Sequence, residues 1–183
     1  MDCYIEIKLL QNPEFTLPIL MNAIFTKLHK VLYDLNSTTI GVSFPNYNLT
    51  LGNILRLHGN EAQLNQMKTN SWIGTLSDYC VISSIKSVPE NIQYRVVYRK
   101  QPTMSHAKLK RLINRGSING QDIINYLKLK EKNILKGPYL ELKSNSNNNI
   151  HRRYIELGPL KENPTKGKFD FFGLSKEATI PWF

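Results

Sequence analysis

The chain has 183 residues, 41% of them hydrophobic, with a formal net charge of +10 and a pI of about 9.6. This composition is enough for one domain, or two small ones, with a hydrophobic core, and the positive charge favours an anionic partner. The two cysteines, Cys3 and Cys80, are too far apart for a CxxC motif and do not suggest a disulfide framework. No apolar run approaches the length of a membrane-spanning helix. Because Asp2 and Glu6 also interrupt any signal peptide, we expect a cytoplasmic protein.

The charge is unevenly divided along the chain. Residues 1–91 contain six Lys or Arg and seven Asp or Glu, whereas residues 92–183 contain eighteen and seven. This asymmetry indicates a binding region rather than general solubility. We therefore expect a neutral domain over residues 1–92 and a basic domain over residues 93–183.

The first 90 residues predict six elements in the order strand, helix, strand, strand, helix, strand. They cover residues 3–9, 19–35, 40–44, 51–58, 61–68 and 80–85. Asn60 is expected to cap the second helix. This order is typical of the split βαβ, or ferredoxin-like, fold. Such folds often present an open sheet face to RNA, although the aromatic motif of an RNA-recognition strand is absent here.

The most basic stretch of the chain runs from Arg95 to Arg115, and no acid occurs between Glu90 and Asp122. Its first part, residues 94–98, is β-branched and aromatic, which predicts a strand. A short helix is expected to follow, because a helical pattern of apolar residues begins soon after this strand.

The expected helix begins after Ser105 as its N-cap and ends at Arg115, with Gly116 at the C-cap position. Leu109, Leu112 and Ile113 form its apolar face, and Lys108, Arg111 and Arg115 share another face. A stripe of this kind fits the phosphate spacing of a nucleic-acid groove. The alternative is a solvated surface helix, but a solvated face usually mixes both signs of charge.

The remainder of the chain predicts further helix and sheet. The expected elements are a helix over residues 122–127, strands over 139–143, 152–157 and 168–172, and a turn at 173–175. The first two of these strands flank an Asn-rich loop and are expected to form a hairpin. The predicted fold class is therefore α+β, with a ferredoxin-like domain followed by a basic α+β domain that carries the Lys/Arg-rich helix.

The sequence points away from metal and nucleotide chemistry. Its fourteen acids are dispersed, its four His and two Cys lack zinc-ligand spacing, and it has no P-loop, so no metal or cofactor is expected. RNA cleavage by the RNA's own 2′-hydroxyl needs only a base, geometry and positive charge. Histidine suits the base role because its unperturbed pKa lies near working pH. The candidates are His29, His58, His106 and His151, and a histidine at any of these positions is more often structural than catalytic.

Several motifs, taken together and in order, resemble the pre-crRNA processing endoribonucleases of subtype I-F CRISPR systems. The motifs are Met1-Asp2-x-Tyr4-Ile5, Phe25-Thr26-Lys27-Leu28-His29, Ile40-Gly41-Val42-Ser43-Phe44-Pro45, Leu142-Lys143-Ser144-Asn145-Ser146, Gly158-Pro159-Leu160, Phe172-Gly173-Leu174-Ser175-Lys176 and Pro181-Trp182-Phe183. Each is weak alone, but the set spans the whole chain. The resemblance implies a ferredoxin-like N-terminal domain and a basic C-terminal domain that binds a repeat hairpin.

The resemblance also implies roles for individual residues. His29 matches the base for the 2′-hydroxyl, Ser144 matches the serine that orients the nucleophile's ribose, and Ser146 is expected near the scissile bond. Arg99 and Gln101 match residues that read bases at the foot of the stem, because Arg pairs with a guanine edge and Gln with an adenine edge. The residues matching a helix in the RNA major groove are Lys108, Lys110, Arg111 and Arg115.

Three departures from the family pattern stand out. Phe172 occupies the position of a tyrosine near the active site, so it is expected to position the catalytic histidine only by packing. His151 replaces a base-stacking phenylalanine and is expected to stack more weakly or to contact phosphate; Arg152 beside it is also expected to bind RNA. Leu112 and Gly116 stand at two positions that carry basic residues in the family pattern, which predicts fewer contacts with the RNA stem.

The function implied is a metal-independent endoribonuclease that cleaves CRISPR repeat RNA at the base of its stem-loop and retains the mature crRNA. The products would carry a 2′,3′-cyclic phosphate and a 5′-hydroxyl. Other subunits of a crRNA-guided surveillance complex are expected partners. One alternative is a non-catalytic subunit that binds the RNA hairpin, in which His29 is a surface residue. A general DNA-binding domain is a further alternative.

Overall fold

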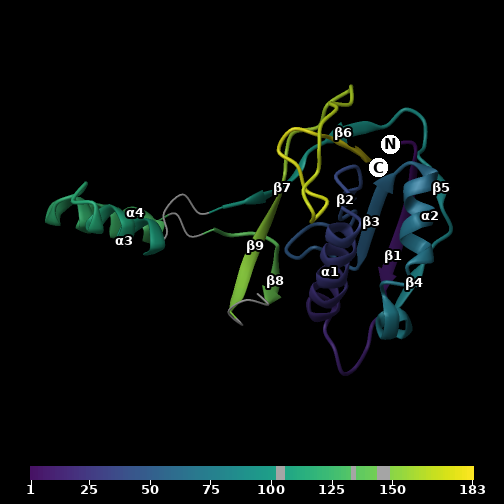
Figure 1. Ribbon diagram of the computed structural model, residues 1–183, viewed down its shortest axis with the longest axis horizontal. Helices are drawn as coiled ribbons and strands as arrows, with labels where there is room; N and C mark the ends of the chain where they lie inside the picture. The colour runs from purple at the N-terminus through teal and green to yellow at the C-terminus, as the bar shows by residue number, and fades with distance from the viewer. Residues whose placement is uncertain (102–105, 133–134, 144–148) are drawn as a thin grey trace. The chain divides into compact units, whose positions relative to one another are not determined.

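The computed structural model describes residues 1–101, 106–132, 135–143 and 149–183. By its contacts the chain divides into two units, residues 1–99 with 137–183, and residues 100–136. Helices and strands both occur, which confirms the predicted α+β class (Figure 1). No described helix combines the length and the apolar character that crossing a membrane requires.

The main sheet is built around β1 (Cys3–Leu9). On one side β1 pairs with β3 (Ile54–Gly59), which in turn pairs with β2 (Gly41–Ser43). On its other side β1 pairs with β4 (Cys80–Ile82) and β5 (Lys86–Ser87). All of these pairings are antiparallel, and the main order is β2-β3-β1-β4. The four strands predicted in this half are confirmed: β1 has the predicted bounds, and β2, β3 and β4 are shorter than expected.

Two α-helices pack against this sheet, and both were predicted. The first, α1 (Leu17–Asp34), has Pro18 in its first turn, where the missing N–H costs no helical hydrogen bond. The second, α2 (Glu61–Thr69), has the predicted cap, because the Asn60 side chain accepts from Gln63 N and the Gln63 side chain accepts from Asn60 N. Between α2 and β4, a 3₁₀ helix covers Gly74–Tyr79.

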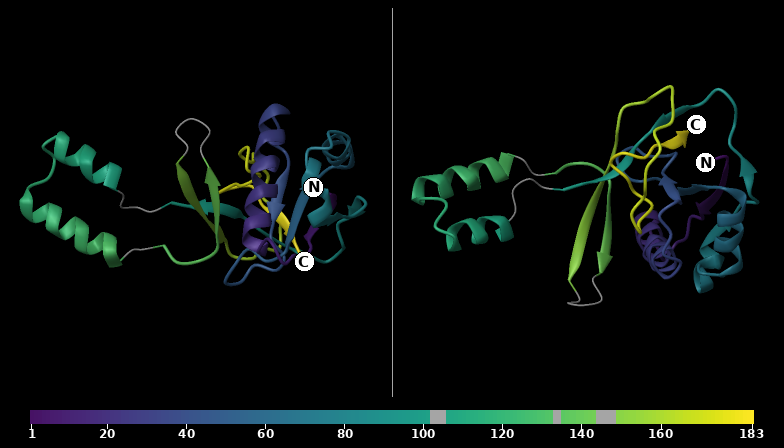
Figure 2. Two further views of the ribbon diagram at one scale, coloured as in Figure 1. Left: turned by 90° about the horizontal axis from the view of Figure 1, so that it is seen from below. Right: turned by 45° about the horizontal axis from the view of Figure 1, so that its top comes forward.

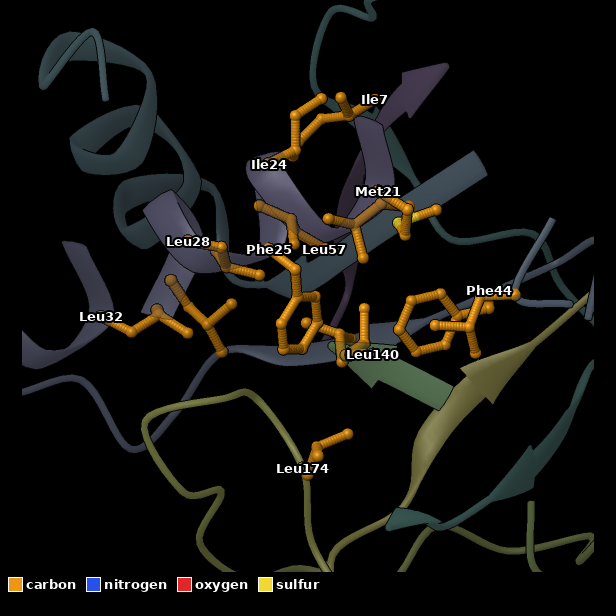
Figure 3. Close-up of a cluster of buried hydrophobic side chains, with 14 of the residues drawn as sticks. Ile7, Met21, Ile24, Phe25, Leu28, Leu32, Phe44, Leu57, Leu140 and Leu174 are labelled. Atoms are coloured by element: carbon orange, nitrogen blue, oxygen red, sulfur yellow. The ribbon is translucent and has the colours of Figure 1, made fainter. Parts of the chain in front are cut away.

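The core of this unit lies between α1 and the strands (Figure 3). The buried face of α1 consists of Leu20, Met21, Ile24, Phe25, Leu28, Val31 and Leu32. Phe25 is fully buried and stacks on Phe44, with 6.0 Å between the ring centres. Leu140 and Leu174, from the C-terminal half of the chain, join the same core. Residues near both ends of the sequence therefore form one hydrophobic core.

The C-terminal part of this unit adds two small sheets. One pairs β6 (Gln93–Arg95) with β10 (Ile180–Trp182). The other has the order β7-β9-β8, with strands Val97–Lys100, Ile150–Leu157 and Tyr139–Lys143. Strands β8 and β9 form the predicted hairpin, in which Leu140 lies opposite Arg153. The strand predicted over residues 94–98 is split at Val96, because the chain there passes from one sheet to the other.

The prediction of a strand over residues 168–172 is wrong. Phe169 N donates to Thr38 O, but the chain then turns, because the Asp170 carboxylate accepts hydrogen bonds from the backbone N–H of Phe172 and Leu174. Side-chain bonds of this kind compete with a strand ladder. Gly173 has a φ of 69°, which favours the predicted turn.

The second unit contains the helices α3 (His106–Asn114) and α4 (Gly120–Lys132) (Figure 2). The predicted C-cap of α3 is confirmed, because Gly116 has a φ of 64° and Ser117 N donates to Leu112 O at 3.1 Å. The residue predicted as its N-cap, Ser105, lies outside the described residues. Helix α4 is longer than predicted and begins beside Asn119, whose side chain accepts from Asp122 N.

The face of the main sheet opposite α1 carries a polar cluster centred on Arg56. In the register of β1 and β3, Glu6 lies opposite Arg56 and Tyr4 lies opposite His58. Arg56 Nη2 lies 2.7 Å from Glu6 Oε1, and its guanidinium lies 4.0 Å from the centre of the Phe183 ring. The buried charge is therefore paired and covered by the end of the described chain.

His58 is fully buried beside this cluster. Its Nε2 lies 2.8 Å from Ser43 Oγ, and its Nδ1 finds no hydrogen-bond partner in the part of the chain that the structure describes. Burial lowers the pKa of His58 to about 3, and the positive charge of Arg56 adds to the effect. His58 is consequently a neutral core residue.

We expect acid to destabilise the fold through His58. The unfolded chain takes up a proton below the ordinary pKa of 6.5, whereas the folded protein does so only near 3. The free energy of unfolding should therefore fall as the pH drops through this window, by about 1.4 kcal/mol per pH unit from this residue. Urea unfolding of wild type and His58→Gln at pH 7, 6 and 5 measures the difference, which should shrink as the pH falls. Parallel pH dependences would contradict this assignment.

Candidate active site

His29 lies on α1 at the edge of the helix's buried face, one turn after Phe25. This position leaves its imidazole half-buried. A residue at such an edge can be held by the core on one side and reach solvent on the other. Sequence periodicity placed His29 at this edge, but it gave no information about what holds the ring.

Two contacts from a distant segment hold the His29 ring. Its Nδ1 lies 2.8 Å from Phe171 O, across 142 residues of sequence. The ring also stacks on Phe172, with 3.7 Å between ring centres and 13° between planes. Because a carbonyl oxygen can only accept a hydrogen bond, Nδ1 carries the proton. Nε2 then has a free lone pair, and no described residue is hydrogen-bonded to it. An imidazole in this state can accept a proton from a substrate hydroxyl.

The segment that holds His29 is itself fixed at several points. The carboxylate of Asp170 accepts from Phe172 N and from Leu174 N, both at 2.9 Å. Gly173 O accepts from Val42 N at 3.0 Å, which ties the turn to β2. A Cβ at Gly173 would lie 2.6 Å from Val42 Cγ1, so the close approach also requires glycine. We name residues 170–174 the histidine-holding turn.

Arg153 stacks on the other face of Phe172. Its guanidinium carbon lies 3.7 Å from the ring centre, the same separation as that of the His29 ring. Two flat groups at this separation would overlap on one face, so they occupy opposite faces. Phe172 is thus sandwiched between an imidazole and a cation.

A second arginine lies beside Arg153. Arg99 on β7 and Arg153 on β9 belong to neighbouring strands, and the Nε atoms of both are buried without a hydrogen-bond partner among the described residues. Burial lowers the pKa of Arg153, the positive charge of Arg99 lowers it further, and the carboxylate of Asp170 opposes these effects. The candidate site is therefore strongly cationic.

Sequence reasoning named Arg152 as an RNA contact and did not name Arg153. In the hairpin register Arg153 lies opposite Leu140, on the face that joins the core, whereas Arg152 lies opposite Glu141 on the other face. Arg152 Nε donates to Glu141 Oε1 at 2.9 Å, and its guanidinium lies 4.6 Å from the Tyr139 ring. Leu140 and Leu142, which alternate with polar residues, were the signal that could have shown which face of the hairpin joins the core.

The other predicted site residues fall into three groups. His151 lies opposite Leu142, on the same face as Arg153, and is exposed. Ser144 and Ser146 lie outside the described residues. The remaining predicted residues belong to the unit of residues 100–136: Gln101, Lys108, Lys110, Arg111 and Arg115. On α3, Lys108, Lys110 and Arg111 are exposed while Leu109 is buried, as the predicted amphipathic pattern requires. Ile113, predicted on the apolar face, is exposed instead.

The structure assigns one tautomer to His29. With neutral imidazole, Nδ1 should carry the proton and Nε2 should not, because Nδ1 donates to Phe171 O. Long-range ¹H–¹⁵N correlation spectra distinguish the two nitrogens. Phe172→Leu should also remove the upfield ring-current shift that stacking gives the imidazole protons of His29. A protonated Nε2, or unchanged shifts in the variant, would contradict the geometry.

Comparison with known proteins places this chain in a family. A family model described as CRISPR-associated protein (Cas_Csy4) matches residues 4–183. The CRISPR-associated endonuclease Cas6/Csy4 of Escherichia coli (strain UTI89 / UPEC) is 39% identical over 184 residues, and that of Pseudomonas aeruginosa (strain UCBPP-PA14) is 32% identical over 187 residues. Both alignments cover 100% of this chain and of the relative. The predicted family and the predicted enzyme class, an endonuclease, are confirmed, and the chain belongs to the Cas_Csy4 family of CRISPR-associated proteins.

Proposed function

We propose that this protein is a metal-independent, sequence- and structure-specific endoribonuclease that cleaves CRISPR repeat RNA at the base of its stem-loop. The observation that carries the proposal is the state of His29. Its Nδ1 donates to Phe171 O, and its Nε2 lone pair is available beside a cluster of unpaired positive charge. A base next to cations is what 2′-hydroxyl attack on a phosphate requires.

In the proposed reaction, Nε2 of His29 removes the proton of a ribose 2′-hydroxyl. The 2′-oxygen attacks the adjacent phosphorus, the bond to the 5′-oxygen breaks, and that oxygen takes a proton. The products carry a 2′,3′-cyclic phosphate and a 5′-hydroxyl. The imidazolium formed on His29 is stabilised by the Phe171 carbonyl and by the face of Phe172. Ser144 is proposed to orient the ribose.

The domain roles are part of the same proposal. Residues 1–92 form a ferredoxin-like domain that carries the histidine, and the sheet order β2-β3-β1-β4 with antiparallel pairing supports this assignment. Residues 93–183 bind the RNA hairpin. The exposed cations of α3 support groove binding, while Arg99 and Gln101 read bases and Ser146, His151 and Arg152 add further contacts.

Retention of the product follows from this separation between the domain that carries the histidine and the domain that binds the RNA hairpin. Most of the proposed RNA contacts lie away from the bond that is cut, so cleavage leaves them in place. The mature crRNA then stays bound, and the protein joins other subunits of a crRNA-guided surveillance complex in the cytoplasm. The net charge of +10 supports an RNA partner, and this electrostatic attraction does not depend on the sequence of the RNA.

Cleavage of two repeat hairpins in EDTA tests the chemistry. One is all ribose, and the other carries a single 2′-deoxy nucleotide upstream of the cut. We expect the first to be cut and the second to be protected. His29→Ala should slow cutting of the first by at least about 10²-fold while hairpin affinity persists, because a positioned base contributes about 10²- to 10⁴-fold.

Asp34→Asn is the matched control on α1. Asp34 is exposed, and its ion pair with Lys30 is also exposed, so the substitution should change neither cutting nor affinity. Tight binding with no cutting by wild type would favour the non-catalytic hairpin-binding subunit. Comparable affinity for duplex DNA would favour a general DNA-binding domain, and cutting only after magnesium is added would refute the mechanism.

A further inference from the structure

The arginine pair beside Phe172 forms no salt bridge among the described residues. Neither Arg99 nor Arg153 forms an ion pair with a described carboxylate, although Arg56 and Arg152 both do. Asp170 is close enough to attract Arg153 electrostatically, but its Oδ1 accepts from two backbone N–H groups. Two like charges on neighbouring strands without an acceptor are an unfavourable arrangement unless an anion binds them.

The orientation of Arg153 leaves it able to bind such an anion. A guanidinium is planar, and all of its N–H groups point outward in its own plane. When it lies flat on Phe172, as the 3.7 Å separation requires, these N–H groups point past the rim of the ring. Stacking on the ring and donation to an anion are therefore compatible.

The position of Arg153 also relates it to His29. The two groups lie on opposite faces of Phe172, each 3.7 Å from its ring centre, so roughly 7 Å separates them. A ribose 2′-oxygen hydrogen-bonded to one group and a non-bridging oxygen of the next phosphate hydrogen-bonded to the other can span this gap, because each hydrogen bond adds about 3 Å. One nucleotide could therefore meet His29 with its hydroxyl and Arg153 with its phosphate.

We propose that Arg153 binds the scissile phosphate of the RNA, with the charge of Arg99 adding to the positive potential there. This inference rests on the proposed endoribonuclease function. As the 2′-oxygen attacks, negative charge grows on the non-bridging oxygens, and a fixed guanidinium stabilises that charge more in the transition state than in the ground state. Phe172 then has two roles, since it supports the base on one face and the phosphate-binding cation on the other.

Two substitutions separate a phosphate contact from a packing role. Arg153→Met keeps an unbranched apolar chain on Phe172 and removes the charge, while Arg153→Lys keeps the charge and loses the flat stack. Lys86→Met, on β5, is the control, because it removes one exposed positive charge from a strand that pairs with β1, in a different sheet from Arg153. Thermal unfolding of each variant establishes that it is folded.

The first measurement is the single-turnover cleavage rate with protein in excess. We expect Arg153→Met to cut about 10²-fold more slowly than wild type, the usual effect of losing one donor to a developing anion. The cleavage rate of Arg153→Lys should recover to within about tenfold of the wild-type rate. Lys86→Met should cut at the wild-type rate. A wild-type rate for Arg153→Met would overturn the proposal, as would a slow rate that Arg153→Lys does not rescue.

The second measurement is the affinity for the uncleavable 2′-deoxy hairpin as a function of salt. Losing one phosphate contact should reduce the slope of log K against log salt by about 0.7 to 0.9, a change that a packing defect does not produce. An unchanged slope for Arg153→Met would overturn the proposal. Because this assay does not need cleavage, it tests Arg153 even if wild type fails to cut, an outcome that would refute the proposed function itself.

Discussion

The contact between His29 and the histidine-holding turn is the interaction on which the rest of the candidate site depends. Phe171 O fixes the tautomer, Phe172 fixes the plane of the ring, and Asp170 holds both residues in a turn tied to β2. They convert a half-exposed helix residue into an imidazole with one defined free lone pair. These contacts join residues far apart in the sequence, so they require α1 and the C-terminal residues to pack together, as they do in one core.

The distribution of charge separates this site from the rest of the molecule. Elsewhere buried or strand-bound arginines are satisfied by carboxylates or carbonyls, as Arg56 is by Glu6 and Arg95 is by Gly158 O. Beside Phe172 the pattern is reversed, since two arginine Nε atoms are buried without an acceptor among the described residues. A protein that binds a polyanion can leave such groups unpaired, because the ligand completes them.

Local pattern was enough to predict most of the fold. The periodicity of α1, the alternation of β1 and the capping residue Asn60 are local signals, and each element formed where it was expected. The exceptions have two causes, side-chain hydrogen bonds within a turn and contacts between distant segments. Residues 168–172 carry strand-like side chains, but Asp170 closes a turn instead. Arg153 could not be distinguished from Arg152 without the register of the hairpin. His29 and Phe172 were identified from family motifs, whereas the hydrogen bond to Phe171 O and the stacking of Arg153 required the fold.

The most direct test of this account is a crystal structure of the wild-type protein bound to a repeat hairpin with a 2′-deoxy nucleotide upstream of the cut. The C2′ atom of that nucleotide should lie within about 4 Å of His29 Nε2, the distance at which the missing hydroxyl would be hydrogen-bonded. His29 Nδ1 should still donate to Phe171 O. A cut-site ribose far from His29, or an imidazole turned so that Nδ1 faces the RNA, would contradict the central claim that the histidine-holding turn prepares His29 as the base.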